Sequence, residues 1–381
     1  MNRPDQDLNV LHVCPELPRE DCPGSMAPAG RQIDSLTDAG VKTQVVDMRG
    51  IPKLKYLQAI PRIRRIARDV DVIHSHFGYC GWLSWIATRA MRSRPKLVMS
   101  FMGDDLLGTP VADGSLTWTS RVQARINKSF AKRFDKVIVK SQEMAGVIAP
   151  CKSTVVANGV DMETFQPMSR DEARKRLNLP LDRKQILFPG NPENPRKGHL
   201  LAAAAVKVAV QQLDEPIDLV PLWNVDPDDV AIYMNACDAM LMMSFIEGSP
   251  NVVKEGLACD LPVIGVQVGD VPEMLDGISG CVVCPRDAEV IGQRLAEQLQ
   301  SETICNGRAV LQDRGLDLAS VAQRVLSIYA SATGLQQPTS TSPTTTVQTV
   351  RESELAEGRT CLLYTSPSPR DLSTSRMPSS A

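Results

Sequence analysis

The sequence lacks the features that would place the chain across a membrane or outside the cell. No apolar run approaches the ~20 residues that a helix needs to span a bilayer. The first residues, MNRPDQDLNVLHVC, do not form the basic region and long apolar run of an export signal. We therefore expect a cytoplasmic protein, whose ten cysteines are reduced and mostly buried.

Two motifs for cofactors or metals are also missing or unconvincing. No G-x-G-x-x-G opens a helix after the first predicted strand, which argues against a dinucleotide oxidoreductase. Cys281 and Cys284 form a C-x-x-C, but GCVVCPRD is typical of a strand that would direct the two thiols to opposite faces. The net charge of -2 gives no indication of a nucleic-acid partner.

What the sequence does contain is a regular alternation of short apolar runs with helical patterns, which is typical of parallel sheets covered by helices. The predicted strands of the first half are 8–14, 41–48, 71–77, 96–101, 136–141 and 153–160. The pattern then restarts, with predicted strands at 185–191, 218–222, 239–244, 262–267 and 280–284, and ends in a helix over 317–331. The expected fold is α/β, with two doubly wound, Rossmann-like domains facing a cleft.

The polar, Gly-containing segment ANGVDMETFQP (157–167) marks the expected boundary between the domains. The prediction is an N-terminal domain over 1–165 and a C-terminal domain over 166–334. Residues 335–381 are rich in Ser, Thr and Pro and are expected to be disordered. The last 21 residues resemble a read-through tail found on unrelated translated sequences, so they carry no functional argument.

The segment SFIEGSPNVVKEGLACDLPVIG (244–265) places two glutamates around a predicted helix start. We predict Ser249 as the N-cap and Pro250 as the first helical residue. The helix would point its N-terminus from the carboxyl edge of the sheet, where open α/β sheets bind ligands and helix N-termini bind anions. Glu247 precedes the helix start and Glu255 lies within the helix, so an anion bound at the helix start would have one carboxylate on each side. Carboxylates accept hydrogen bonds from hydroxyl groups, which suggests a diphosphate flanked by hydroxyl-rich groups, as in a nucleotide sugar.

Residues 236–275 around these glutamates resemble the donor-site signature of the retaining glycosyltransferases of family 4, the "group 1" enzymes with two Rossmann-like domains and the B-type fold. The two glutamates of the family, separated by seven residues, match Glu247 and Glu255. Further similarity occurs at 71–78, 100–108, 157–167 and 188–198. The resemblance implies that Glu247 lies beside the transferred sugar and that Glu255 binds the ribose.

The same resemblance implies a cationic site for the diphosphate. The lysine that contacts the diphosphate in the family matches Lys197, and a cation there stabilises the charge that develops on the leaving group. Asn191 stands where the family often has an arginine, so Arg196 is its expected substitute; an exposed surface arginine is the alternative. The other expected donor-binding residues are Gly190, Asn191, Gly248, Ser249, Pro250, Asn251 and Val252.

The acceptor is expected on the first domain. Gly24 matches the glycine loop of the family, and Met102 replaces the histidine that often faces the sugar. Asp104 or Asp105 is then a candidate for a polar role toward the acceptor, with the choice left open. His74 and His76 are expected to point to opposite faces of one strand, so that only one, with His76 preferred, reaches the cleft; both could instead be core histidines.

These observations predict a retaining, metal-independent hexosyltransferase with no cofactor, since no D-x-D motif lies at the donor site. Its partners would be a nucleotide-sugar donor and a glycan or lipid-linked acceptor. A sugar-nucleotide-binding protein without catalysis is the alternative. The segment 53–68 alternates apolar residues with six cations and predicts peripheral contact with an anionic membrane, although an ordinary surface helix has the same pattern.

Overall fold

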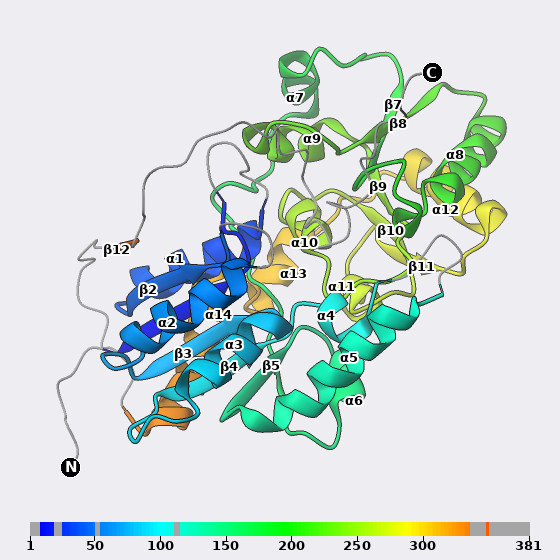
Figure 1. The fold of residues 1–381 in the computed structure, drawn as a ribbon. Coiled ribbons are helices and arrows are strands. Elements are labelled where there is room, and N and C mark those ends of the chain that lie inside the picture. The colour runs from blue at the N-terminus through cyan, green and yellow to red at the C-terminus, as the bar shows by residue number, and fades with distance from the viewer. Residues whose placement is uncertain (1–7, 19–24, 50–53, 110–114, 336–347, 350–381) are drawn as a thin grey trace, which may run out of the picture.

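The protein contains two parallel β-sheets, each with helices on both faces (Figure 1). The structure is a computed structural model, and it describes residues 8–18, 25–49, 54–109, 115–335 and 348–349. This architecture confirms the predicted fold class. Among the described residues, no helix is both long and apolar enough to cross a membrane.

The first sheet has the strand order β12-β2-β1-β3-β4-β5-β6, and every neighbouring pair is parallel. Its strands are β1 (Asn9–Cys14), β2 (Lys42–Asp47), β3 (Val72–His76), β4 (Lys96–Ser100), β5 (Lys136–Val139), β6 (Thr154–Val155) and β12 (Gln348–Thr349). Its helices are α1 (Ala27–Asp38), α2 (Leu54–Ile66), α3 (Gly78–Thr88), α4 (Asp104–Leu107), α5 (Trp118–Phe130) and α6 (Gln142–Ile148).

The second sheet has the order β11-β10-β9-β7-β8 and is also parallel throughout. Its strands are β7 (Lys184–Phe188), β8 (Ile217–Pro221), β9 (Ala239–Met242), β10 (Val263–Val266) and β11 (Val282–Cys284). The helices in this half are α7 (Arg170–Arg176), α8 (His199–Leu213), α9 (Val230–Ala236), α10 (Asn251–Ala258), α11 (Val271–Leu275), α12 (Ala288–Gln300) and α13 (Gly307–Asp313).

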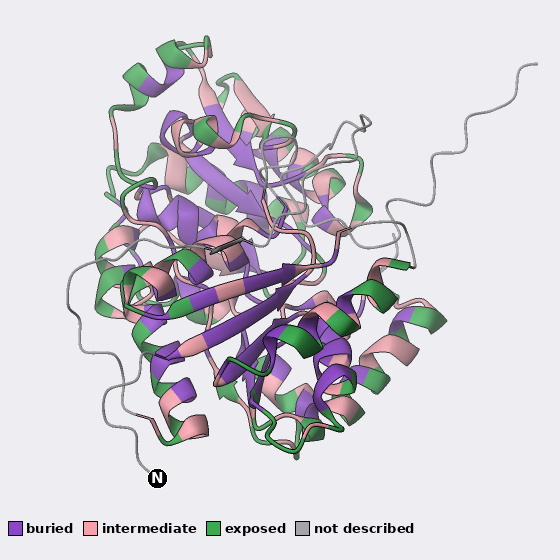
Figure 2. Cartoon of the chain, turned by 60° about the vertical axis from the view of Figure 1, so that its left-hand side comes forward, coloured by how far each residue is buried: buried purple, intermediate pink, exposed green. Residues whose placement is uncertain are grey.

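The second sheet forms because its central strands are apolar on both faces. All four residues of β9, AMLM, and all four of β10, VIGV, are buried, as parallel strands covered by helices require. Figure 2 shows the strands of both sheets as mostly buried ribbons between exposed helix faces. The predicted strand over 153–160 is reduced to β6, a two-residue strand at the sheet edge.

The last helix differs from the predicted division of the chain. We expected residues up to 334 to belong to the second domain, but α14 (Leu318–Thr333) packs on the first sheet beside α1. Val325 and Tyr329 are fully buried in one cluster with Val10 and Val72. The apolar face of this helix is therefore satisfied by the first sheet, so the chain crosses between the two halves twice.

Candidate active site

The helix that follows β9 begins one residue later than predicted. Pro250 is the N-cap of α10 and Asn251 is its first residue, so Ser249 is not the cap. The Ser249 hydroxyl instead accepts a hydrogen bond from the buried Lys254 ammonium at 3.0 Å. Val252 packs against the core of the second half. The predicted donor loop joins β9 to α10, so it lies at the carboxyl edge of the second sheet. Its serine is hydrogen-bonded to Lys254 of α10.

Glu247 forms an ion pair with Lys197, with 2.9 Å between Oε1 and Nζ. The side chains are only 14% and 7% exposed. Burial alone would raise the pKa of Glu247, but Lys197 and Arg196 outweigh it and hold that pKa below its usual value. The carboxylate therefore stays ionised, and the two groups position one another.

Two glycines allow Lys197 to reach this place. Gly190 has φ 142°, and a Cβ there would lie 3.1–3.2 Å from the Lys197 side chain. Gly198 has φ 74°, and a Cβ there would lie 2.2 Å from the carbonyl oxygen of Met243. Both positions combine a positive φ with close packing, which favours glycine. Asn191 beside them accepts a hydrogen bond from the Glu193 N–H and so caps the turn.

Arg196 crosses from the second half to the first, where it pairs with Asp104 at 2.7 Å. Burial raises the pKa of Asp104, and Arg196 offsets only part of this effect. The structure thereby distinguishes the two candidate aspartates. Asp105 is buried and accepts the backbone N–H groups of Met102, Gly103 and Gly78, so it holds the first half together rather than facing the second.

Glu255 makes a contact that the sequence did not predict. Its carboxylate, 2% exposed, accepts a 2.6 Å hydrogen bond from Arg31 of α1. The Arg31 guanidinium also lies 5.6 Å from the centre of the Phe165 ring. Asn251, one helical turn before Glu255, accepts a hydrogen bond from Asn158 at 3.2 Å. No local motif identifies Arg31, because it lies 224 positions from its partner.

Arg286 is a second residue that the sequence analysis missed. Its guanidinium donates to the carbonyl oxygens of Met243 at 3.0 Å and Ser244 at 2.9 Å, and it lies 3.9 Å from the centre of the Phe245 ring. These contacts fix the loop that carries Glu247. Gly248 follows in the same loop and approaches Gly103, whose Cβ position would be 3.5 Å from the Gly248 nitrogen.

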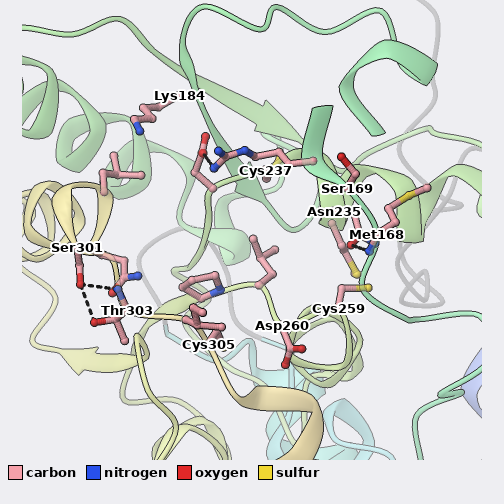
Figure 3. A pocket seen from close by; sticks show the side chains of 18 of the residues that line it. Met168, Ser169, Lys184, Asn235, Cys237, Cys259, Asp260, Ser301, Thr303 and Cys305 are labelled. Carbon is pink, nitrogen blue, oxygen red and sulfur yellow. Dashed lines mark hydrogen bonds and ion pairs between the residues drawn. The ribbon is translucent and has the colours of Figure 1, made fainter. Parts of the chain in front are cut away.

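A cleft of about 1220 Å³ lies between α4 and α6 of the first half and the strand ends of the second. Glu247, Phe245 and Arg286 are among its lining residues. A separate pocket of about 510 Å³, drawn in Figure 3, lies at the opposite edge of the second sheet, near Lys184 and Cys237. Of the predicted site residues, Glu247 lines the first of these cavities, and none lines the second.

The two histidines of β3 contradict our expectation. His74 and His76 lie on the same face, with ring centres 4.2 Å apart, because side chains two positions apart on a strand share a face. Both are buried, and His12 of β1 joins them, with 3.1 Å between His12 Nδ1 and His76 Nε2. Burial lowers the pKa of His12 to about 3 and lowers that of His76 well below its usual value. His76 is therefore a neutral core histidine rather than an exposed cleft residue.

The three histidines are also the group within the described residues that could hold a metal ion, with ligand atoms within 4.8 Å of one another. The nitrogens of His74 are already hydrogen-bonded to Tyr329 and Ser100.

Cys281 lies beside Cys305 rather than forming a pair with Cys284. Gly24 lies outside the described residues.

Comparisons with known proteins agree with this geometry. Residues 10–164 match the family model described as "Glycosyltransferase Family 4", and residues 220–301 match "Glycosyl transferases group 1". The chain is 26% identical over 311 residues to D-inositol 3-phosphate glycosyltransferase 1 of Catenulispora acidiphila, which covers 70% of this chain and 74% of that protein. A similar relative in Mycolicibacterium smegmatis is 26% identical over 294 residues, covering 69% of this chain and 67% of that protein.

Solved structures show the same fold at low identity. Sucrose-phosphate synthase from Thermosynechococcus elongatus superposes with a TM-score of 0.64 at 16% identity, covering 85% of this chain and 98% of that one. The Anabaena protein HepE, solved with UDP and glucose, gives 0.61 at 16% identity, covering 85% and 100%. The fold is thus that of the B-type glycosyltransferases. The chain belongs to glycosyltransferase family 4, and it is a glycosyltransferase.

Proposed function

We propose that the protein transfers a sugar from a nucleoside diphosphate sugar to its acceptor with retention of configuration and without a metal ion. The observation that carries this proposal is the buried pair of Lys197 and Glu247, next to Arg196, at the carboxyl edge of the second sheet. This arrangement supplies two cations where a diphosphate leaving group would develop charge. Two cations at this position can stabilise the leaving group without a metal ion.

The chemistry assigned to these groups follows from their charges. When the bond between the anomeric carbon and the diphosphate oxygen breaks, negative charge grows on the diphosphate, and Lys197 and Arg196 stabilise it. The acceptor hydroxyl attacks from the same face of the sugar, and the leaving phosphate takes its proton. A retaining glycosidase uses two carboxylates about 5–5.5 Å apart, with one as nucleophile. Glu247 is already paired with Lys197, which favours front-face transfer over a covalent intermediate.

The HepE structure contains UDP and glucose, which supports UDP-sugars as the first donors to test. Product stereochemistry and metal dependence then test the proposal directly. We expect NMR of the product to show the anomeric configuration of the donor, and we expect EDTA to leave turnover unchanged. An inverted product, or activity that EDTA abolishes and Mg²⁺ restores, would refute it. Titration with UDP, GDP and ADP identifies the base.

We also propose that α2 contacts an anionic membrane surface. Leu54 and Leu57 are 47% and 65% exposed, and the same helix carries exposed Arg64 and Arg65. An interfacial helix combines such apolar and cationic groups. Sedimentation with anionic vesicles should exceed that with neutral vesicles; equal sedimentation would exclude this contact.

A further inference from the structure

The second half contains two free cysteines, Cys281 and Cys305, whose thiols are in contact. The Cys281 thiol donates a hydrogen bond to the sulfur of Cys305. Two further hydrogen bonds hold the same segments in place. The backbone N–H of Ser279 donates to the side-chain oxygen of Asn306 at 2.9 Å, and the backbone N–H of Val263 donates to the Cys281 sulfur at 3.2 Å. The fold therefore keeps the two sulfur atoms adjacent.

One of these two thiols can be reached from a pocket. Cys305 lines the cavity of about 510 Å³ at the amino edge of the second sheet, and Figure 3 draws its side chain there. Cys281 is not among the residues that line this cavity. The four residues before Cys305, 301–304, are all exposed. A small neutral molecule that enters the pocket therefore meets Cys305 before it meets Cys281.

The surroundings of Cys305 favour its thiolate form. Its sulfur accepts hydrogen bonds from the Cys281 thiol and from the backbone N–H of Gly307, and the first of these lowers its pKa although burial opposes the shift. The pKa of Cys281 is raised, first by the hydrogen bond to Cys305 and then by burial. Because the thiolate is the reactive form of cysteine, Cys305 should react first with an oxidant, while Cys281 keeps its proton.

We propose that Cys305 and Cys281 form a reversible disulfide when the protein meets hydrogen peroxide. The Cys305 thiolate attacks one oxygen of the peroxide, the O–O bond breaks, and hydroxide leaves, which gives a sulfenic acid. The Cys281 sulfur then attacks the Cys305 sulfur and the S–O bond breaks. The hydroxyl group leaves as water with the Cys281 proton, and the S–S bond forms. One peroxide thus oxidises both thiols, and a dithiol reductant restores them.

The disulfide would shift a segment that is bonded to the donor helix. A disulfide brings its two sulfur atoms to about 2.05 Å, closer than a hydrogen bond does. Gly307, two residues after Cys305, packs so tightly on α10 that a Cβ there would lie 2.7 Å from the carbonyl oxygen of Leu257. Arg308 donates to a carbonyl oxygen at the end of α10 at 3.0 Å. Because α10 also carries Glu255, we expect the disulfide to weaken nucleotide binding, an expectation that rests on the proposed function.

Peptide mapping of the full chain without reductant tests for the disulfide. Trypsin cleaves after Lys and Arg, so Cys305 falls in the peptide 295–308. Cys281 falls in the peptide 255–286, which also contains Cys259 and Cys284. After treatment with one equivalent of hydrogen peroxide we expect mass spectrometry to find these two peptides cross-linked, and we expect dithiothreitol to separate them. The absence of this cross-link would overturn the proposal.

Serine variants identify which cysteine of the longer peptide takes part. Cys281→Ser and Cys305→Ser should each abolish the cross-link. Cys284→Ser and Cys259→Ser are the matched controls and should keep it. Cys305→Ala adds no polar group and replaces the serine variant if that variant does not fold. A cross-link that persists in Cys281→Ser, or that either control removes, would overturn the assignment of the pair.

Titration calorimetry with UDP, GDP and ADP measures the effect on the donor site. The disulfide should weaken binding of the preferred nucleotide by about fivefold or more, the lower end of the coupling usual between two linked sites. Cys281→Ser treated with peroxide should show no such change. Equal affinities of the oxidised and the reduced wild type would overturn the coupling to α10. If no nucleotide bound even the reduced chain, the proposed function would fail, whereas the peptide map would still decide whether the disulfide forms.

Discussion

The two halves of the protein present different chemistry to the cleft between them. The second half contributes charged residues that are close in sequence, Arg196 with Lys197 and Glu247 with Glu255, and holds them in ion pairs. The first half contributes Arg31 and Asp104, which pair with Glu255 and Arg196, and it keeps its three histidines buried in its core. The charged residues of the second half therefore lie in short motifs, whereas the residues of the first half that pair with them are distant from them in sequence.

The largest effect should come from removing the cation of the donor half. Lys197→Ala should lower kcat by ~10²–10³, the scale for losing one group that stabilises developing charge. The matched control is Lys207→Ala, which removes an exposed lysine of α8 in the same half and should leave kcat unchanged. Wild-type turnover in Lys197→Ala would show that the diphosphate is stabilised elsewhere.

Glu247→Ala should have the next largest effect. The carboxylate lies 2.9 Å from Lys197 and holds its ammonium in place, and a small misplacement of a catalytic group costs on the order of 10²-fold in rate. We expect kcat to fall by about this factor and discrimination between donor sugars to weaken. Isothermal titration should find nearly unchanged affinity for the free nucleotide. Loss of nucleotide affinity with normal kcat would instead place Glu247 at the nucleotide.

Lys140 tests whether a buried lysine in the core of the first half lowers stability. It is 1% exposed, and its ammonium has no hydrogen-bond partner among the described residues. Burial, and then Lys254, lowers its pKa to about 7, while Asp105 opposes this shift. Because the folded pKa lies below the unfolded value of 10.5, the contribution of Lys140 to stability is most favourable above pH 10.5, declines as pH falls toward 7, and stays reduced below it. The shift corresponds to on the order of 5 kcal/mol.

Lys140→Met should therefore raise the melting temperature at pH 6–7, and its advantage over the wild type should shrink toward pH 10. Lys128→Met, at an exposed position of α5, should show no such pH-dependent difference. Thermal unfolding across this pH range measures both. An advantage of Lys140→Met that stayed constant with pH would mean that folding does not lower the pKa of this lysine.

The contact between the halves can be tested at Arg31, with a smaller expected effect. Its hydrogen bond to Glu255 is charge-assisted, and such bonds contribute about 1.5–3 kcal/mol. Arg31→Ala should therefore raise the KM for the donor by roughly tenfold, with a smaller change in kcat, because the carboxylate loses its orientation. A double-mutant cycle with Glu255→Ala should show that the two effects are not additive. Additive effects would mean that the pair does not act as a unit.

The sequence predicted the parts of this molecule that are local. The alternation of apolar runs indicated two parallel sheets, and the spacing of Glu247 and Glu255 located the loop that binds Lys197. It could not predict Arg31 or Arg286, because their partners are distant in the chain. It also misplaced α14, since an amphipathic pattern does not say which sheet buries it. The expectation for the histidines of β3 was wrong for another reason: the strand period of two places them on one face.

The smallest effect is expected from removing the C-terminal tail. This truncation tests whether the two halves alone are sufficient for activity. A chain that ends at Leu335 keeps α14, whose buried Val325 and Tyr329 complete the core of the first half. It loses β12, a two-residue strand that pairs with β2 at the edge of the first sheet, where few contacts are at stake. We expect kcat and donor KM to stay within experimental error of the full-length values. A second truncation before Leu318 is the matched control and should abolish folding, because it exposes the apolar surface that α14 covers. If the chain ending at Leu335 bound donor with normal affinity but had lost turnover, residues beyond 335 would take part in a step after donor binding, and the two halves alone would not account for the activity.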